Sequence, residues 1–181
     1  MNRVEQAIER AGLLEVLRAR ERGDLDAVRE SVASWRGADL LALGALADRI
    51  RREEVGDVVR FVLPSSGRAD DAGVHVAKGE NAGLDFLRAV AIARITAEKG
   101  SNVRIDWDDA GFELAQVALG FGANELVGRI ANKRGLPLAE GEVLGVGKRS
   151  RMELAELVKR RELEGFVRRA GRTPAFAPEV G

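Results

Sequence analysis

A nearly continuous run of β-prone apolar residues at 58–63, closed by Pro64, limits the possible folds more than any other feature of the chain. Such runs are typical of strands buried on both faces of a parallel sheet. Residues 39–54 directly precede the run, and their apolar side chains recur on one face of an amphipathic helix. A helix leading into a buried strand is the repeating unit of an α/β fold, so we expect a parallel sheet covered by helices.

The rest of the chain continues this alternation. β-prone segments predict further strands at 73–77 and 102–107, with Val103 and Ile105 facing the same way. Helical periodicity and end signals predict the remaining elements. Before the first strand, these are a helix over 2–20 stopped by Gly23 and a helix over 24–32 capped by Asp24. After it come a helix over 84–98, a buried helix over 112–119, and strands at 125–129 and 142–146. A last helix runs from the S-x-x-E capping box at 150–153 to Ala170 and is ended by Gly171 and Pro174.

Charge balance and the lack of cysteine exclude several classes of function. Lys and Arg total 29, as do Asp and Glu, so the chain has no global attraction to nucleic acid or to an anionic membrane. Its 181 residues include no cysteine, which excludes disulfides and thiolate metal ligands and fits a cytoplasmic protein. No apolar run approaches the roughly 18 residues of a membrane span. We expect one domain with a helical appendage, no nucleic-acid or membrane partner, and no metal.

Six segments together resemble one family of enzymes. They lie at 39–51, 56–62, 84–94, 103–107, 111–124 and 170–174, and the most specific is Gly-Phe-Glu-Leu-Ala-Gln-Val-Ala-Leu-Gly-Phe-Gly-Ala-Asn at 111–124. The family is the radical-SAM enzymes of the futalosine route to menaquinone, namely aminofutalosine synthase and dehypoxanthine futalosine cyclase, with the deazaflavin-cofactor synthases as close relatives. The resemblance implies a (β/α) barrel.

The chain departs from this family at the point where the chemistry resides. The family holds its cluster motif C-x3-C-x2-C and about half a barrel in the stretch that corresponds to Leu63–His75, where this chain has about a dozen residues and no cysteine. An iron–sulfur cluster needs three thiolates that leave one iron open to SAM. We therefore expect no such cofactor, and a shortened or partial barrel at 39–181 behind an N-terminal helical extension at 1–38.

Three candidate site residues are expected at the carboxyl ends of strands, where α/β folds place functional groups. His75 is the only histidine and lies near the end of the short strand expected at 73–77; a structural or solvent-exposed role is the alternative to a functional one. Asp106 and Trp107 begin an acidic segment that extends to Asp109. The aspartates either cap the helix that begins near Gly111 or bind a ligand, with Trp107 as an apolar wall.

Two further candidates come from the 111–124 segment. Gln116 lies in the helix expected to be buried, where its amide must find partners in the backbone or in a ligand. Asn124 follows two glycines in a loop whose backbone either approaches a ligand closely or forms a tight helix end. The candidate ligand-binding set is thus His75, Asp106, Trp107, Gln116 and Asn124, and no catalytic residue is assigned.

The leading functional hypothesis is a non-catalytic relative of the menaquinone-pathway enzymes that acts as an accessory, scaffold or ligand-sensing protein. The alternative is a cluster-independent enzyme acting on a nucleoside-like or quinone-precursor molecule, with His75 and Asp106 in proton transfer. A third reading is a structural remnant without a ligand. Expected partners are a second copy of the chain, since a partial barrel leaves unpaired strand edges, or a menaquinone-pathway enzyme, together with a small molecule.

Overall fold

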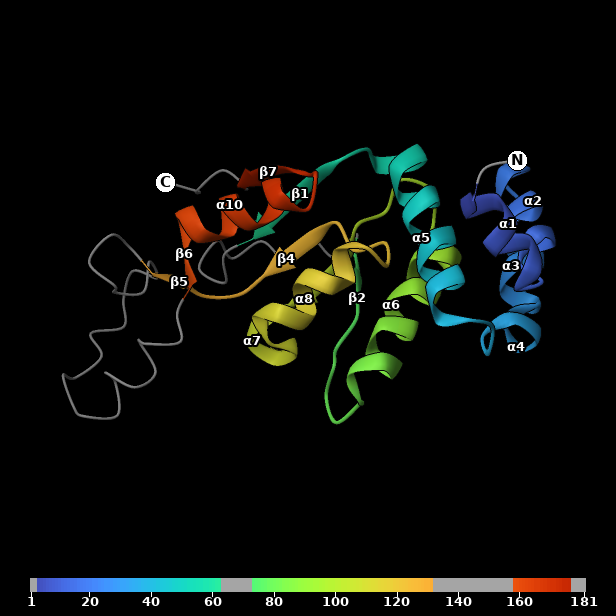
Figure 1. The fold of residues 1–181 in the computed structure, drawn as a ribbon, viewed down its shortest axis with the longest axis horizontal. Helices are drawn as coiled ribbons and strands as arrows, with labels where there is room; N and C mark the ends of the chain where they lie inside the picture. The colour runs from blue at the N-terminus through green and yellow to red at the C-terminus, as the bar shows by residue number, and fades with distance from the viewer. Residues whose placement is uncertain (1–2, 63–72, 132–157, 177–181) are drawn as a thin grey trace.

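The computed structural model describes residues 3–62, 73–131 and 158–176 (Figure 1). The chain begins with four short helices, α1 (Arg3–Arg10), α2 (Leu14–Glu21), α3 (Leu25–Glu30) and α4 (Val32–Trp35). The predicted single helix at 2–20 is therefore two helices, because Gly12 lies between them with a φ of 74°, which a continuing helix does not permit. Asp24 caps α3 as predicted, with its carboxylate accepting a hydrogen bond from the Ala27 amide at 3.2 Å.

The long helix α5 (Leu40–Val55) confirms the amphipathic pattern. Its first turn is capped by Asp39, whose carboxylate accepts from the Ala42 amide at 2.9 Å. It ends at Gly56, where φ is 70°, a conformation that glycine adopts without a Cβ penalty. The chain then enters β1 (Val58–Val62).

All five strands of the main sheet run parallel, in the order β2-β3-β4-β1-β7. Besides β1 they are β2 (Val74–His75), β3 (Val103–Asp106), β4 (Glu125–Val127) and β7 (Thr173–Phe176), and a separate pair joins β5 (Ile130–Ala131) to β6 (Val158–Lys159). The α/β class with a parallel sheet is thus confirmed, and the shortened barrel stays a prediction. β1 pairs with β4 on one side and β7 on the other, so the first strand is not an unpaired edge.

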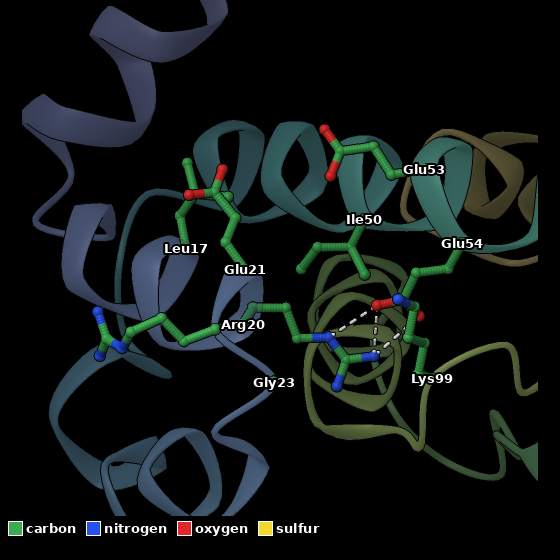
Figure 2. Close-up of a pocket in the computed structure, with 9 residues that line it drawn as sticks. Leu17, Arg20, Glu21, Gly23, Ile50, Glu53, Glu54 and Lys99 are labelled. Carbon is green, nitrogen blue, oxygen red and sulfur yellow. Dashed lines mark hydrogen bonds and ion pairs between the residues drawn. The ribbon is translucent and has the colours of Figure 1, made fainter.

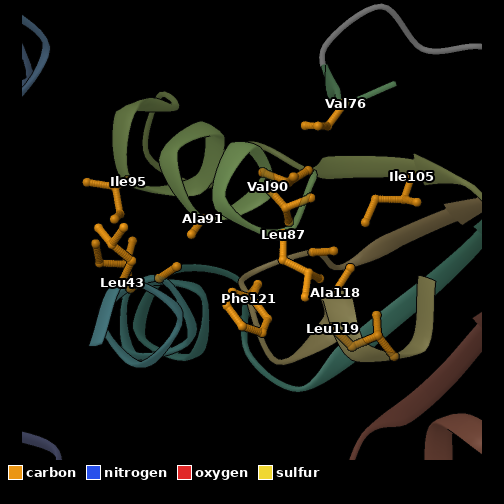
Figure 3. Close-up of a cluster of buried hydrophobic side chains, with 14 of the residues drawn as sticks. Leu43, Val76, Leu87, Val90, Ala91, Ile95, Ile105, Ala118, Leu119 and Phe121 are labelled. Carbon is orange, nitrogen blue, oxygen red and sulfur yellow. The ribbon is translucent and has the colours of Figure 1, made fainter. Parts of the chain in front are cut away.

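Helices α6 (Gly83–Thr96), α7 (Trp107–Ala110), α8 (Phe112–Leu119) and α10 (Arg160–Arg169) complete the described elements. Helices α5 and α6 pack side by side, and buried side chains of α6 and α8 meet Ile105 of β3 in one apolar cluster (Figure 3). Leu17 and Trp35 belong to the same cluster. The predicted N-terminal extension therefore shares one core with the sheet domain.

Strand β1 is buried along one face, and on the other face only its last residue, Val62, is buried. Val59 and Phe61 are buried, whereas Val58 keeps 41% of its surface exposed and the Arg60 side chain 45%. The charged residue inside an otherwise apolar run marks the face that does not meet the helices.

The predicted strand at 142–146 and the start of the last helix at 150–153 lie outside the described residues. Within the described ranges, no helix combines the length and apolar character that crossing a membrane requires.

Candidate functional site

The carboxyl edge of the parallel sheet is closed by an aromatic cluster. Phe61 stacks on Phe176 with ring centroids 4.7 Å apart, and Trp107 meets Phe61 edge-on at 6.2 Å. Trp107 is buried, and its indole N–H donates to the Arg129 carbonyl at 3.3 Å. A Cβ built on Gly128 would lie 2.2 Å from the Trp107 ring, so glycine is needed for the indole to lie there. Trp107 is thus a packed wall of this edge.

The aspartates that follow β3 bind groups of the same chain. The Asp106 carboxylate accepts the Asp108 amide at 2.8 Å and caps α7. Asp108 accepts the amide of Arg129 at 3.2 Å and its Nε at 3.0 Å. Asp109 accepts the backbone amides of residues 78 and 79 at 2.6 and 3.3 Å. The capping interpretation of this segment holds, although the capped helix is α7 at Trp107 and not the helix that follows Gly111.

His75 lies at the carboxyl end of β2 and is exposed. In the parallel register it stands opposite Arg104 of β3, two residues before Asp106. Among the described residues, no hydrogen bond or ion pair involves its imidazole. Of the five candidates, His75 is therefore the one whose side chain is both at this edge and available to a ligand or partner.

Asn124 lies at the opposite edge, which corrects its expected place beside His75 and Asp106. It precedes β4, and its backbone amide donates to the Val103 carbonyl at 3.1 Å, where β3 begins. The side chain is 2% exposed. Its Oδ1 accepts from Arg94 at 2.5 Å and from the Val103 amide at 2.8 Å, and its Nδ2 donates to Asn102 at 2.7 Å. Because these bonds use its donor and acceptor, Asn124 holds the fold together.

Gln116 is exposed on the surface of α8, so the expectation of a buried amide is wrong. The buried residues of this helix are Ala115, Ala118 and Leu119, while Val117 is also exposed. The helix is apolar on most sides in sequence, but only the side that packs on α6 and the sheet is covered. Gln116 therefore needs no internal partner and is not brought near the other candidates.

A row of charged residues across the middle of the sheet was missed from the sequence. Arg104, Glu125 and Arg60 occupy one register position on three adjacent strands. Glu125 is 2% exposed and forms a short ion pair with Arg104, and its second oxygen lies 3.8 Å from the Nε of Arg60. The signal was the single arginine inside V-R-F of β1 and the alternating charges of V-R-I-D in β3, which mark the face away from the helices.

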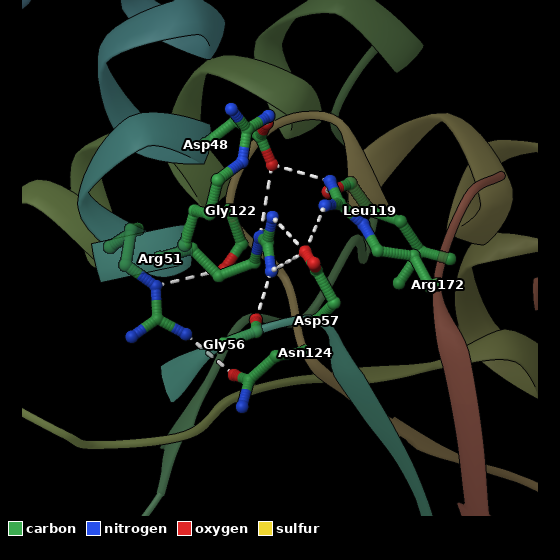
Figure 4. Close-up of polar contacts among 10 residues, drawn as sticks. Asp48, Arg51, Gly56, Asp57, Leu119, Gly122, Asn124 and Arg172 are labelled. Atoms are coloured by element: carbon green, nitrogen blue, oxygen red, sulfur yellow. Dashed lines mark hydrogen bonds and ion pairs between the residues drawn. The ribbon is translucent and has the colours of Figure 1, made fainter. Parts of the chain in front are cut away.

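The amino edge of the sheet carries a denser polar network, in which two arginines share two aspartates (Figure 4). Arg51 donates to Asp48 at 2.9 Å, to Asp57 at 3.3 Å and to the Gly56 carbonyl. Arg172 reaches Asp57 at 3.1 Å and also Asp48. Burial alone would raise the pKa of Asp57, but the hydrogen bonds and charges of Arg51 and Arg172 outweigh it, so that its pKa is lowered below 3.8.

Arg94 is the most enclosed cation of this edge. Its guanidinium donates to the carbonyls of Gly122 at 2.8 Å and Ser101 at 2.7 Å, besides Asn124. Burial lowers its pKa to about 10, with Glu54 opposing the shift, so it stays charged at neutral pH. Among the described residues, the charges of Arg51, Arg94 and Arg172 are matched by acceptors of the chain itself, although the Nε of Arg172 is buried without a partner. This arrangement indicates a structural role.

The metal-ligating side chains of this chain do not fit the iron–sulfur cluster that the family resemblance implies. An iron–sulfur cluster requires thiolate ligands, and the chain has no cysteine. Within the part of the chain that the structure describes, no group of three or more histidine or acidic side chains is arranged to hold a metal ion. No step of a reaction is therefore assigned through a cluster or a metal.

Comparison with known proteins gives partial matches to three curated enzymes, while no protein-family model matches. Two are called 5-amino-6-(D-ribitylamino)uracil–L-tyrosine 4-hydroxyphenyl transferase. The one from Archaeoglobus fulgidus is 30% identical over 130 residues, or 71% of this chain and 34% of the relative; the one from Methanosarcina barkeri is 31% identical over 113 residues, or 62% and 27%. The third, cyclic dehypoxanthine futalosine synthase from Streptomyces coelicolor, is 29% identical over 92 residues, or 51% and 20%.

The chain thus spans about a third or less of the length of the curated relatives it matches. One relative carries futalosine in its name, as do the enzymes that the sequence resembles. The similarity to these three enzymes is consistent with the resemblance to radical-SAM enzymes seen in the sequence.

Proposed function

We propose that this chain is a non-catalytic relative of the futalosine-pathway radical-SAM enzymes and acts as an accessory, scaffold or ligand-sensing protein. The main support for the proposal is the short connection between β1 and β2, together with the absence of cysteine. Only residues 63–73 separate β1 from β2, in the stretch where the resemblance would put the cluster motif, and no cysteine is present. Without thiolates the radical chemistry of the family has no starting point.

The carboxyl edge supports the same proposal. Trp107 is packed against Phe61, and the carboxylates of Asp106, Asp108 and Asp109 each accept a backbone amide of the chain. A general acid or base must reach the proton that it transfers, and carboxylates engaged in capping are poorly placed for that role. The exposed His75 is left as a contact for a ligand or a partner rather than as one half of a catalytic pair.

Anaerobic reconstitution with iron and sulfide tests whether radical-SAM chemistry is absent, on which the non-catalytic part of the proposal rests. The expected result is a protein without bound iron and without cluster absorbance, because no thiolate is available to displace solvent from iron. Stoichiometric iron that survives desalting would overturn the proposal. Because the readout is bound iron, it does not depend on knowing a substrate.

The accessory and ligand-sensing roles are separated by two further measurements. Light scattering of the chain alone and mixed with a cyclic dehypoxanthine futalosine synthase tests for a homodimer or a complex with a pathway enzyme. Futalosine-type compounds are then titrated while the fluorescence of Trp107 is followed in a Trp35→Phe variant, since Trp35 is also buried and would add background. Unchanged fluorescence and melting temperature at millimolar concentration would remove the ligand-sensing role, whereas a complex with the enzyme would support the scaffold.

A further inference from the structure

A cavity of about 360 Å³ lies away from the sheet, between α2, α5 and the turn that follows α6 (Figure 2). Leu17 and Ile50, both buried, give it an apolar side. Its volume lies within the range of small-molecule sites. Gly23, on the rim, has a φ of 75°, and a Cβ there would meet nothing within 4 Å, so the chain itself leaves this side open.

A buried ion pair forms one wall of this cavity. Arg20 and Glu54 meet through two parallel bonds of 3.0 and 2.9 Å, with side-chain exposures of 5% and 9%. A third donor of Arg20 reaches the Ala97 carbonyl at 2.6 Å, and the Gly100 amide donates to Glu54 at 3.3 Å. Both charges are matched within the chain, so this wall contributes no free charge to the cavity.

On the rim of the cavity, the acidic side chains have ion-pair partners and two basic side chains have none in the part of the chain that the structure describes. Glu21 and Glu53 both bind Arg49, at 2.9 and 3.0 Å. Arg22 and Lys99 also line the cavity, and within the described residues neither has an ion pair or hydrogen bond from its side chain. The three carboxylates of the cavity thus all have arginine partners, and the charged groups still available are both cations.

We propose that this cavity binds a small organic anion, with its carboxylate or phosphate group at Arg22 and Lys99 and its apolar part against Leu17 and Ile50. Exposed cations on flexible stems contribute modest attraction individually, so the apolar side is needed for binding. The site is independent of the function proposed above, because it lies between the N-terminal helices and α5 and not at the sheet. A bound anion would stabilise the packing of α2 on α5, since a ligand that binds only the folded state raises its stability.

Thermal-shift and calorimetric titrations of the full chain test this site with four probes: benzoate, phenyl phosphate, inorganic phosphate and benzyl alcohol. Benzoate, phenyl phosphate or both should bind and raise the melting temperature, and the stronger of the two tells whether a carboxylate or a phosphate is preferred. Inorganic phosphate lacks the apolar part and benzyl alcohol lacks the charge, so both should bind much more weakly. The proposal would be overturned if inorganic phosphate or benzyl alcohol bound as tightly as the aromatic anions, or if neither benzoate nor phenyl phosphate bound.

A double variant with Arg22→Gln and Lys99→Gln places the binding at this cavity. Both residues are exposed, so the fold should tolerate the change, and affinity should fall roughly tenfold. The matched control is Arg161→Gln with Arg169→Gln, two exposed cations on α10, which should leave affinity unchanged. Unchanged affinity in the cavity variant, or an equal loss in the control, would show that the probes bind elsewhere.

Discussion

The two edges of the parallel sheet use polar residues in different ways. At the amino edge, Arg94 and Arg51 are almost fully buried and donate to carbonyls and carboxylates from several elements. At the carboxyl edge, aromatic rings fill the space and the aspartates bind backbone amides near the surface. Figure 4 shows the first arrangement, in which the contacts join the end of α5, the start of β1 and the segment before β7.

The difference indicates at which edge of the sheet the polar residues can be replaced without loss of stability. A buried guanidinium requires that its acceptors stay in place, because removing it leaves them unsatisfied. In (β/α) barrels the amino edge of the sheet generally serves stability and the carboxyl edge serves function. Here the charges of the amino edge join several elements, and the carboxyl edge retains His75, whose side chain has no internal bond among the described residues.

Replacing Arg94 by methionine should have the largest effect. The substitution keeps an apolar stem but leaves the Gly122 and Ser101 carbonyls and the Asn124 side chain without their donor. The free energy of unfolding should fall by about 3 to 5 kcal/mol, measured by urea denaturation. The control is Arg52→Met on the neighbouring helix, whose side chain is 64% exposed and forms a surface ion pair with Asp48 at 3.1 Å, so the loss should stay below about 1 kcal/mol. A loss below about 1 kcal/mol for Arg94→Met itself would mean that the network at the amino edge is dispensable.

Gly128→Ala should have the next largest effect and tests the packing of the carboxyl edge. The new Cβ would lie 2.2 Å from the Trp107 ring, so the indole has to shift from its present position at a cost of about 1 to 3 kcal/mol. Thermal unfolding measures the cost, and tryptophan fluorescence reports the movement. Gly37→Ala is the control, since a Cβ there meets nothing within 4 Å. A stable Gly128→Ala variant with unchanged fluorescence would show that Trp107 is not closely packed.

Local signals in the sequence predicted the elements well, but not the contacts between them. The α5 helix followed from its period, its Asp39 cap and its end at Gly56, all within one segment. Strand β7 was missed, because Pro174 reads as a helix stop and the pairing partner β1 lies more than a hundred residues earlier in the chain.

The site residues show the same limit. Gln116 was placed inside because α8 is apolar on most sides, but the packing of α6 decides which side is covered. Asn124 was grouped with His75 because it follows a helix, whereas the register of β3 and β4 puts it at the other edge. The row of Arg60, Glu125 and Arg104 depends on that register too. Which residues share an edge is set by long-range pairing, which short motifs do not contain.

The pH dependence of stability that arises from Asp57 at the amino edge should be smaller than these mutational effects and limited to acidic pH. The pKa of Asp57 is lowered below 3.8 in the folded chain, so its contribution to stability is fully present above that pH and is lost as the pH falls through the folded value. We expect the stability difference between the protein and an Asp57→Asn variant to be constant near neutrality and to shrink below pH 3.8. Denaturation at several pH values measures it. A difference that already shrinks near pH 6 would show that another group controls it.

His75→Gln should have the smallest effect on stability and sharpens the comparison most directly. The imidazole is exposed at the end of β2, and among the described residues it forms no hydrogen bond or ion pair, so the free energy of unfolding should change by less than about 0.5 kcal/mol. The same urea titration used for Arg94→Met measures it, and glutamine keeps a polar side chain of similar length. A loss above about 1 kcal/mol would mean that the carboxyl edge, like the amino edge, depends on its polar residues, and the contrast between the edges would no longer hold. A stable variant that loses binding to a futalosine-type compound or to a partner enzyme would place the functional contact at His75.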